Sequence, residues 1–374
     1  MAKGVYVGVD GVARRVKTMY VGVNGVARKI KTGYIGINGI ARKFFGFVPF
    51  EFYAKAGELE PAPQATHPMD RTNAAAITFG DYSLWAGGGS GASKDPFTRV
   101  IDVIDRSFTK LPNLNLSRPK NYLGAAVVGN YVIFPGGTYD QNGARGASND
   151  LDVYDRSLTK VNTNPLSLHF TESFGRTLGE NAFFRIVETS SLLTVSSSLT
   201  AKITAAANRA YGYPAGDIVG NSIVFATANS YVATEVVRIN ASGTTTKFGA
   251  FTNGTRYGFG GASVGDKVFF AGGSEANGQV GTVTAYDESG TQYASLAELR
   301  HVGTYIGGAR TDSNAIFVGG YNRPYIEWLN LSGTYEGSAT LKGSSSYPCG
   351  ETILGDYLLV QDQYTAVNAY VLPE

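Results

Sequence analysis

The sequence is short of the residues that build disulfide frameworks and metal cages. Its 374 residues include three histidines and a single cysteine, Cys349. One cysteine cannot form an internal disulfide, and it cannot supply a cysteine-based zinc site. Both kinds of scaffold are therefore excluded. A chain of this length can hold two or three ordinary domains, or one large closed β-architecture with an appendage.

Charged residues and long apolar runs are also scarce. Charged residues make up 17% of the chain, against about 25% in a typical soluble protein. No stretch approaches the roughly 20 apolar residues of a membrane-spanning helix. The first residues lead straight into a strand pattern, without the apolar core of a signal peptide. We therefore expect a protein that is made in the cytosol, is not inserted into a membrane, and is not exported by the general secretory route.

Glycine and aromatic residues, by contrast, are abundant. The chain has 48 glycines, 23 tyrosines and 20 phenylalanines, a composition typical of a β-protein with many tight turns. The near-neutral total charge hides a split between two parts. Residues 1–47 carry nine Lys or Arg and one acid, a net charge of +8, whereas residues 48–374 carry a net charge of −6. This split predicts two domains with different roles.

Residues 1–47 contain three near-identical units with a period of 14 residues. The units begin at Tyr6, Tyr20 and Tyr34, and each holds Asp-Gly or Asn-Gly between β-branched runs. That pattern is the strongest short-range indication of a β-hairpin. Folding the first unit about its turn pairs Tyr6 with Arg15 and leaves valines on the opposite face. The sequence thus predicts an arm of three tandem β-hairpins.

The apolar face of these hairpins needs a partner, because an isolated hairpin is marginally stable in water. We expect it to meet sister chains or a larger assembly. The alternatives are folding back on the rest of the chain and, less favoured, binding nucleic acid, since no stacking aromatics interleave with the cations. The residues assigned to assembly are Tyr6, Val7, Val9, Tyr20, Val21, Val23, Tyr34, Ile35 and Ile37.

A second repeat, of 41 to 50 residues, takes over from about residue 50. Each copy has a Gly-Asp or Gly-Asn turn, about five mostly apolar residues and often Gly-Gly, then a polar loop and further strands. Seven copies can be counted, and the last ends after three strands. Residues 51–59 resemble a fourth strand and precede the first full copy. Their pairing with the last copy would close a ring and remove its exposed edge.

This pattern resembles the kelch-repeat family over about residues 50–374. The resemblance implies an all-β fold: a seven-bladed kelch-like β-propeller closed by an N-terminal strand and preceded by the hairpin arm. Trp85 and Trp328 do not occupy the family's tryptophan position. The matching features are arginines ahead of the inner strands (Arg71, Arg118, Arg300), Tyr-Asp turns at 154–155 and 286–287, and Gly-Gly pairs at 87–88, 136–137, 272–273 and 319–320.

No catalytic or cofactor site stands out. Kelch-like rings include copper oxidases of the galactose-oxidase type, and the repeat phase puts the three histidines and Cys349 on one face. No two of these residues share the close spacing of metal ligands, however. The sialidase box and the Gly-x-Ser-x-Gly elbow are absent as well. We therefore expect neither a metal nor a cofactor, and a non-enzymatic role. The histidines are His67, His169 and His301.

Binding of a ligand remains as the function to consider, because the strand order puts the long variable loops, residues 136–150 among them, on one face. These loops mix Gly, Ser, Asn and Asp with aromatic residues and arginine, a combination suited to sugars or peptide side chains. The alternative is that they are solvated loops without a ligand. The candidate ligand-binding residues are Arg118, Tyr122, Tyr139, Arg145, Tyr321, Arg323 and Tyr325.

The units of the arm resemble short repeats in virion proteins of phages and prophages of Gram-positive bacteria, over roughly residues 4–46. The resemblance implies a phage structural protein in the virion, either a tail receptor-binding protein or a capsid fibre. Its arm would bind other virion proteins or sister chains. Its propeller loops would bind a host cell-surface glycan or protein, with avidity from repeated chains. The alternatives are an intracellular kelch-type interaction scaffold and, less favoured, a copper or carbohydrate oxidase-like propeller.

Overall fold

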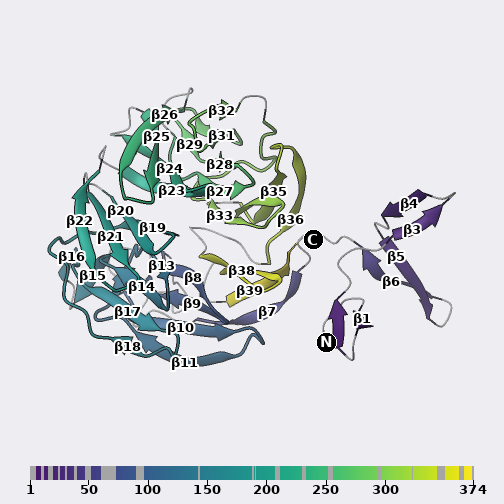
Figure 1. Ribbon diagram of the computed structural model, residues 1–374, viewed down its shortest axis with the longest axis horizontal. Coiled ribbons are helices and arrows are strands. Elements are labelled where there is room, and N and C mark those ends of the chain that lie inside the picture. Colours follow the sequence, from purple (N-terminus) through teal and green to yellow (C-terminus); the bar gives the residue numbers. More distant parts are fainter. Residues whose placement is uncertain are drawn as a thin grey trace.

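The regular structure of this chain consists of β-strands wherever it is described. No helix that could cross a membrane occurs in the described ranges. Figure 1 shows most strands arranged as a ring of sheets, with hairpins of the N-terminal residues outside it. The computed structural model describes residues 6–9, 12–15, 20–23, 26–29, 32–37, 40–46, 52–59, 73–89, 97–141, 144–187, 189, 191–206, 211–229, 233–251, 256–293, 296–321, 323–342, 350–361 and 366–372.

The ring contains seven four-stranded antiparallel sheets, numbered here 1 to 7 along the chain. In sheets 1 to 6 the first strand lies nearest the centre of the ring and the fourth lies outermost (Figure 1). Sheets 1 to 3 comprise β8 (Ala75–Phe79), β9 (Tyr82–Ala86), β10 (Val100–Asp105) and β11 (Lys110–Asn115); β13 (Ala126–Val128), β14 (Tyr131–Pro135), β17 (Leu151–Asp155) and β18 (Lys160–Val161); and β19 (Ser173–Leu178), β20 (Asn181–Ile186), β21 (Ser191–Ser196) and β22 (Ala201–Ala205). Sheets 4 to 6 comprise β23 (Tyr211–Val219), β24 (Ser222–Asn229), β25 (Ala233–Asn240) and β26 (Thr245–Ala250); β27 (Gly260–Val264), β28 (Lys267–Ala271), β31 (Val283–Asp287) and β32 (Gln292–Tyr293); and β33 (Gly307–Arg310), β34 (Asn314–Val318), β35 (Tyr325–Asn330) and β36 (Tyr335–Thr340).

Sheet 7 joins the two ends of the ring. β39 pairs antiparallel with β7, from Ala366 opposite Glu58 to Tyr370 opposite Phe52. This is the place at which the repeat pattern predicts that residues 51–59 pair with the last copy. The pairing covers the edge that three strands alone would leave open. Sheet 7 comprises β37 (Glu351–Leu354), β38 (Tyr357–Gln361), β39 (Ala366–Val371) and β7 (Phe52–Glu58).

Aromatic rings reinforce this junction. The ring of Tyr53 on β7 lies 4.8 Å from Tyr357 on β38 and 5.9 Å from Phe108 of sheet 1, measured between centroids. Phe108 and Tyr357 also meet edge to face, at 5.1 Å. Such pairs contribute about 0.5–1.5 kcal/mol each beyond their buried area. Side chains therefore join sheet 7 to sheet 1 where the backbone ladder ends.

The apolar core is divided among the contacts between consecutive sheets. Seven clusters of buried residues each combine side chains from two neighbouring sheets, and one of them joins sheet 7 to sheet 1. Successive residues of a strand point to opposite neighbours, since side chains alternate along a strand. Phe269, for example, packs toward sheet 6, whereas Phe270 packs toward sheet 4. Both faces are buried, which explains the continuous apolar runs in the sequence.

A recurrent turn joins the third and fourth strands of six sheets. In sheet 1 the Asp105 carboxylate accepts hydrogen bonds from the N–H and Oγ of Ser107 and from the N–H of Thr109. Phe108 adopts a φ of 63° inside this turn. The sequence predicts that the fourth strand begins at Phe108, but the turn holds residues 105–109, so β11 begins at Lys110. Related turns occupy residues 155–159, 196–200, 240–244, 287–291 and 330–334.

The Gly-Gly pairs follow directly after second strands. Gly136 and Gly137 have φ values of 57° and 94°, a backbone conformation that side chains disfavour. A Cβ atom added at Gly136 would lie 2.1 Å from the ring of Phe170. These glycines therefore allow a strand bend and close packing between sheets.

The tandem repeats of the N-terminal residues form three two-stranded hairpins. Tyr6 lies opposite Arg15, Tyr20 opposite Lys29, and Tyr34 opposite Lys43, which is the predicted pairing. The hairpins are β1 (Tyr6–Val9) with β2 (Val12–Arg15), β3 (Tyr20–Val23) with β4 (Val26–Lys29), and β5 (Thr32–Ile37) with β6 (Ile40–Gly46).

Candidate functional site

The connections of the ring fall on two faces, because neighbouring strands run in opposite directions. First-to-second and third-to-fourth strand turns share one face, called here the short-turn face. Second-to-third connections and the links between sheets share the other, called the long-loop face. All the candidate ligand-binding residues lie on connections of the long-loop face, or next to them.

Part of the long-loop face is an added three-stranded sheet, with the order β12-β15-β16. Its strands come from the link between sheets 1 and 2 and from the long connection inside sheet 2. The sequence predicts residues 136–150 as a loop, but the structure folds much of that loop into a hairpin. The added sheet comprises β12 (Lys120–Asn121), β15 (Thr138–Gln141) and β16 (Ala144–Ala147). A smaller hairpin, β29 (Ser274–Glu275) with β30 (Gly278–Gln279), occupies the corresponding connection of sheet 5.

Arg118 and Tyr139 meet on this added sheet. The guanidinium of Arg118 lies 5.0 Å from the centre of the Tyr139 ring. Its Nε lies 2.8 Å from Oδ2 of Asp150, and its Nη2 donates to Oδ1 of the same carboxylate at 3.1 Å. This two-point ion pair fixes the guanidinium plane over the tyrosine ring. The half-buried pair therefore presents a preorganised aromatic and cationic surface.

Arg145 forms a second pair of the same kind beside the first. Its guanidinium lies 4.6 Å from the centre of the Phe97 ring, and its Nε lies 3.0 Å from Oδ2 of Asp140, directly opposite it in the ladder. Arg145 is exposed, whereas Phe97 is buried. The added sheet thus brings Arg118, Tyr139 and Arg145 together. Sequence reasoning missed Phe97, although it lies in a connection of the same class.

A buried ionic network supports the added sheet from beneath. Nζ of the fully buried Lys120 lies 2.7 Å from Oδ2 of Asp152 and 3.3 Å from Oδ2 of Asp150. Nζ of Lys160 lies 2.7 Å from the other oxygen of Asp152. Burial raises the pKa of Asp152, but the charge of Lys120 and hydrogen bonds from Lys120, Lys160 and Ser117 outweigh it, so this pKa lies below its ordinary value.

Tyr321 and Tyr257 form a separate exposed group on the long-loop face. They are 41% and 39% exposed. The backbone of Tyr321 bridges to Thr304, whose hydroxyl reaches the carbonyl of Tyr257 at 3.4 Å. Nearby in the chain, the rings of Tyr325 and His301 stack with centroids 3.5 Å apart. Sequence reasoning identified Tyr321 and Tyr325 but missed Tyr257, which also lies in a link between sheets.

Arg323 has a structural role that the sequence does not reveal. It is fully buried, and its Nη2 lies 2.5 Å from Oε2 of Glu327. Its other nitrogens donate to the carbonyls of His301, Gly319 and Tyr325. The guanidinium therefore joins the link at His301 to both ends of its own connection, and we leave Arg323 out of the candidate contact surface. Its partner Glu327 lies on a buried third strand, a charge pattern that could have indicated this role.

Tyr122 follows β12 directly and has a φ of 55°. Its N–H donates to the carbonyl of Asn73, which has a φ of 57° in the preceding link. Tyr305 occupies the corresponding position before sheet 6, with a φ of 59°. A left-handed backbone is costly for a tyrosine and persists only where neighbouring structure imposes it. Tyr122 is half-buried and belongs to the frame of the loop face.

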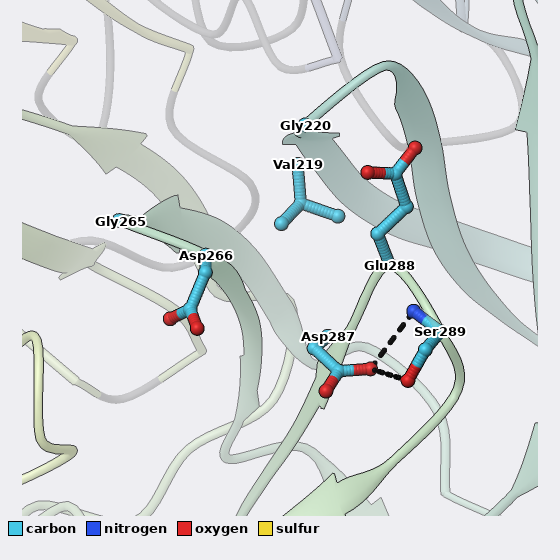
Figure 2. A pocket seen from close by; sticks show the side chains of 7 residues that line it. All are labelled: Val219, Gly220, Gly265, Asp266, Asp287, Glu288 and Ser289. Carbon is cyan, nitrogen blue, oxygen red and sulfur yellow. Dashed lines mark hydrogen bonds between the residues drawn. The ribbon is translucent and has the colours of Figure 1, made fainter.

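A pocket of about 320 Å³ lies on the short-turn face, between turns of sheets 4 and 5 (Figure 2). Figure 2 shows the carboxylates of Asp266, Asp287 and Glu288 around it. Each carboxylate already has protein partners. Asp266 pairs with Lys267 at 2.6 Å, and Oε1 of Glu288 accepts the N–H of Asn221 and the hydroxyl of Ser222. The other lining residues are Val219, Gly220, Gly265 and Ser289.

Asp287 is the most strongly perturbed group of that pocket. Its partial burial raises the pKa, but hydrogen bonds from Ser289, Thr291 and Tyr293 outweigh it and lower the pKa to about 2. The carboxylate is an acceptor within the recurrent third-to-fourth strand turn. The same acceptor position recurs in the other five turns of this kind, so we interpret the cluster around the pocket as turn structure.

Comparison with solved structures identifies the fold. A streptogramin B lyase, which is a β-propeller, aligns with a TM-score of 0.57 over 87% of this chain and 98% of that chain, at 14% sequence identity. This chain is a β-propeller. At that identity the likeness extends to the fold alone. No family model matches the sequence, and no curated protein matches it.

The candidate residues form two separate groups on the propeller. Arg118, Tyr139 and Arg145 lie on connections of sheets 1 and 2, whereas Tyr321 and Tyr325 lie on a connection of sheet 6. Sheets 2 and 6 are not neighbours in the ring (Figure 1). The face therefore offers two patches, of which the one on the added sheet is the more completely built.

The structure describes only some of the other residues that the sequence analysis singles out. Among the described residues of the propeller, no group of three or more His, Cys, Asp or Glu side chains could hold a metal ion. His67, Cys349 and Arg71 lie outside the described residues. The predicted assembly residues are placed on β-strands, but their side chains lie outside what the structure describes. They are Tyr6, Val7 and Val9 on β1, Tyr20, Val21 and Val23 on β3, and Tyr34, Ile35 and Ile37 on β5.

Proposed function

We propose that this chain is a non-enzymatic virion protein, a tail receptor-binding protein or a capsid fibre. Its N-terminal arm, residues 1–47, attaches it to other virion proteins or to sister chains. The long-loop face of its propeller, within residues 48–374, binds a host cell-surface glycan or protein. The seven four-stranded sheets are taken as the blades of a kelch-like propeller that β7 closes.

One observation carries the recognition part of this proposal: the added sheet β12-β15-β16. It lies outside the seven four-stranded sheets, and it displays Arg118 over Tyr139 and Arg145 over Phe97. The buried pairs of Lys120 with Asp150 and Asp152 hold it in place. Aromatic rings flanked by fixed polar groups suit sugar rings and peptide side chains. Rigid support below such a surface lowers the ordering cost of binding.

The arm supports the attachment part of the proposal. Its three hairpins repeat one register, with a tyrosine opposite a cation in each. Its net charge of +8 contrasts with −6 for the rest of the chain. Three repeats with an apolar face provide a multivalent contact, and several copies on one particle would convert weak single contacts into stable adhesion.

Binding to cells tests the recognition surface. We expect the full-length chain to bind intact Gram-positive cells, or glycans from their walls, in a pull-down or array measurement. The double substitution Tyr139→Ala with Arg145→Ala should lower the affinity about tenfold or more, since truncating central aromatic and arginine contacts has that effect. The matched control Arg106→Gln removes an exposed cation from the short-turn face and should bind like the wild type.

Two outcomes would contradict this proposal. Equal binding by the double variant and the wild type would show that the added sheet does not contact the ligand. A folded full-length chain that binds neither cells nor wall glycans would remove the receptor-binding role. Imaging of particles with an antibody against the chain tests the virion location separately, and unlabelled particles would count against it.

The fold likeness to a streptogramin B lyase supplies an enzymatic alternative. That likeness spans 98% of the lyase chain. Incubation of the full-length chain with streptogramin B, with the compound followed by chromatography, tests whether this chain shares the activity. Loss of the compound at a rate proportional to protein concentration would favour the enzyme. An unchanged compound would leave the binding role as the proposal. The intracellular kelch-type scaffold stays a further alternative, and soluble protein partners in place of cell-surface ligands would favour it.

A further inference from the structure

The inner strands of five consecutive sheets carry a cluster of mixed charge. It consists of Arg176 on β19, Asp217 on β23, Ser263 on β27, Arg310 on β33 and Glu351 on β37. Inner strands surround the axis of the ring (Figure 1). The cluster belongs neither to the patches on the long-loop face nor to the pocket on the short-turn face.

Asp217 sits between the two arginines. Its Oδ1 lies 3.5 Å from Nε of Arg176, and its Oδ2 lies 3.6 Å from Nε of Arg310. Oδ2 also accepts hydrogen bonds from the N–H and Oγ of Ser263, at 3.1 and 2.9 Å. The carboxylate is therefore fixed by sheet 5, and one guanidinium lies at ion-pair distance from each of its oxygens.

The outer ends of both guanidiniums are available to a ligand. The side chains of Arg310 and Arg176 are 46% and 32% exposed. Nη1 of Arg310 donates to the carbonyl of Ile218 and to Oγ of Ser263, and Nη1 of Arg176 donates to the carbonyl of Gly175. Neither Nη2 atom has a hydrogen-bond partner among the described residues. The bonded Nη1 atoms hold the planes so that each Nη2 is preorganised as a donor.

Glu351 occupies a position where the inner strand of the neighbouring sheet 6 has glycine. Glu351 lies opposite Val360 in its ladder, and Gly308 lies opposite the corresponding Phe317 of sheet 6. A Cβ atom added at Gly307 would lie 2.2 Å from the Glu351 carboxyl group. The N–H of Gly308 donates to Oε1 of Glu351 at 3.0 Å. The glycines thus leave room for one carboxyl group, which lies close enough to Arg176 to interact with its charge.

Glu351 is half-buried, and its surroundings favour the protonated form of its carboxyl group. Burial raises the pKa of Glu351 to about 8, against the opposing effects of the Gly308 hydrogen bond and the charge of Arg176. Two arginines, Asp217 and an uncharged Glu351 leave the cluster with a formal charge of +1. A ligand with one negative charge would balance it, whereas a dianion such as sulfate would reverse it, which a partly desolvated site disfavours.

We propose that this cluster binds the carboxylate of a small organic acid, such as a uronic acid, through Nη2 of Arg176 and Nη2 of Arg310. The hydroxyl group of the protonated Glu351 carboxyl is a further donor to the same anion. Ionisation of Glu351 places a like charge beside the ligand and removes that donor. This ligand site does not depend on the attachment role proposed above.

The test measures binding of glucuronate to the full-length chain by titration calorimetry, with glucose as the matched neutral sugar and sulfate as the competing dianion. We expect glucuronate to bind at pH 6.5 and glucose not to bind. Arg310→Gln should weaken glucuronate binding about tenfold or more, as loss of a charge-assisted contact does. The control Arg106→Gln should bind like the wild type, and circular dichroism checks the fold of each variant.

The dependence on pH distinguishes this site from a general attraction of anions. If only the protonated form of Glu351 binds, the apparent affinity at pH 9 should be about tenfold lower than at pH 6.5, because that form is then a small fraction. Glu351→Gln should keep the affinity nearly constant over this range. The other groups that face Glu351, Arg176 and the Gly308 amide, do not change charge there.

Four results would overturn the proposal. These are no binding of glucuronate by the wild type, equal binding by Arg310→Gln, an unchanged pH dependence in Glu351→Gln, and sulfate binding as tight as glucuronate binding. None of these four results affects the cell-binding test, since the added sheet lies on another part of the propeller.

Discussion

Buried charges in this propeller recur at one position of the third strand. Asp102, Asp152 and Glu327 lie opposite Trp85, Phe134 and Phe317 of the second strands, and each is fully buried. Each has a cation from a neighbouring segment: Lys110, Lys120 and Arg323. Removing one member of such a pair leaves the other as an uncompensated buried charge. These pairs therefore fix the loops more than they bind any ligand.

Asp152→Asn tests that role. The substitution leaves Lys120 with only Asp150, which already pairs with Arg118. We expect a loss of about 3 kcal/mol in the free energy of unfolding at pH 7, as for other broken buried pairs. Urea unfolding measures it. The control Asp81→Asn breaks the exposed pair with Arg106 and should cost under about 1 kcal/mol.

The pH dependence of this effect has a defined sign. The pKa of Asp152 lies below its ordinary value of 3.8 in the folded protein. The ionised carboxylate therefore stabilises the fold above about pH 4, and the contribution is lost as the pH falls through the folded-state pKa. The difference between wild type and Asp152→Asn should shrink in that acid range. A constant difference down to pH 2 would contradict the assignment.

Glu351→Gln should have the opposite dependence. The pKa of Glu351 rises from 4.5 to about 8 on folding. Between these values the unfolded state releases a proton that the folded state keeps, so the wild type loses stability as the pH rises. We expect the variant to gain stability relative to the wild type from pH 5 to pH 8. Thermal unfolding across that range measures the gain, and parallel curves for the two proteins would contradict it.

At the scale of elements, the junction of β7 with sheets 7 and 1 determines whether the ring closes. Tyr53 contributes two ring contacts there, with Phe108 and with Tyr357. We expect Tyr53→Ala to lower the free energy of unfolding by about 2–4 kcal/mol, because it removes buried aromatic area and leaves a space at the junction. Urea unfolding measures it. The control Val302→Ala changes a half-exposed side chain, and an equal loss in both variants would contradict a special role for the junction.

The repeat pattern predicts the strands well, because turn glycines and apolar runs are local features. It also predicts the pairing of β7 with β39, because the last copy has only three strands and residues 51–59 resemble the missing fourth. Residues 136–150 fail as a loop prediction because β15 and β16 pair with each other and with β12, a contact that the period does not encode. Arg323 fails as a ligand contact because its environment depends on Glu327 and three backbone carbonyls. The sequence does not reveal the cluster around Asp217, because its members come from five different repeats.

At the scale of the whole molecule, the arm and the propeller divide the chain. One acidic substitution on the apolar face of each hairpin, Val9→Asp, Val23→Asp and Ile37→Asp together, should disrupt association by that face, since buried unpaired charges are costly. We expect the wild type to be oligomeric and the triple variant to be monomeric by light scattering. Substitution to Thr at the same three positions is the control. A monomeric wild type would rule out self-association as the role of the arm and leave attachment to other proteins as its role.

β7 is both the strand that closes the ring and the first ring strand after the hairpins. A pulling force applied to the N-terminal hairpins therefore reaches the ring at β7, in sheet 7, before it reaches any other sheet. β7 runs antiparallel to β39 with irregular register at two points. A pulling force is therefore distributed unevenly over the hydrogen bonds between these two strands. A particle tethered by the arm and bound by the loop face would strain this strand first, and its release would open the circle between sheets 7 and 1.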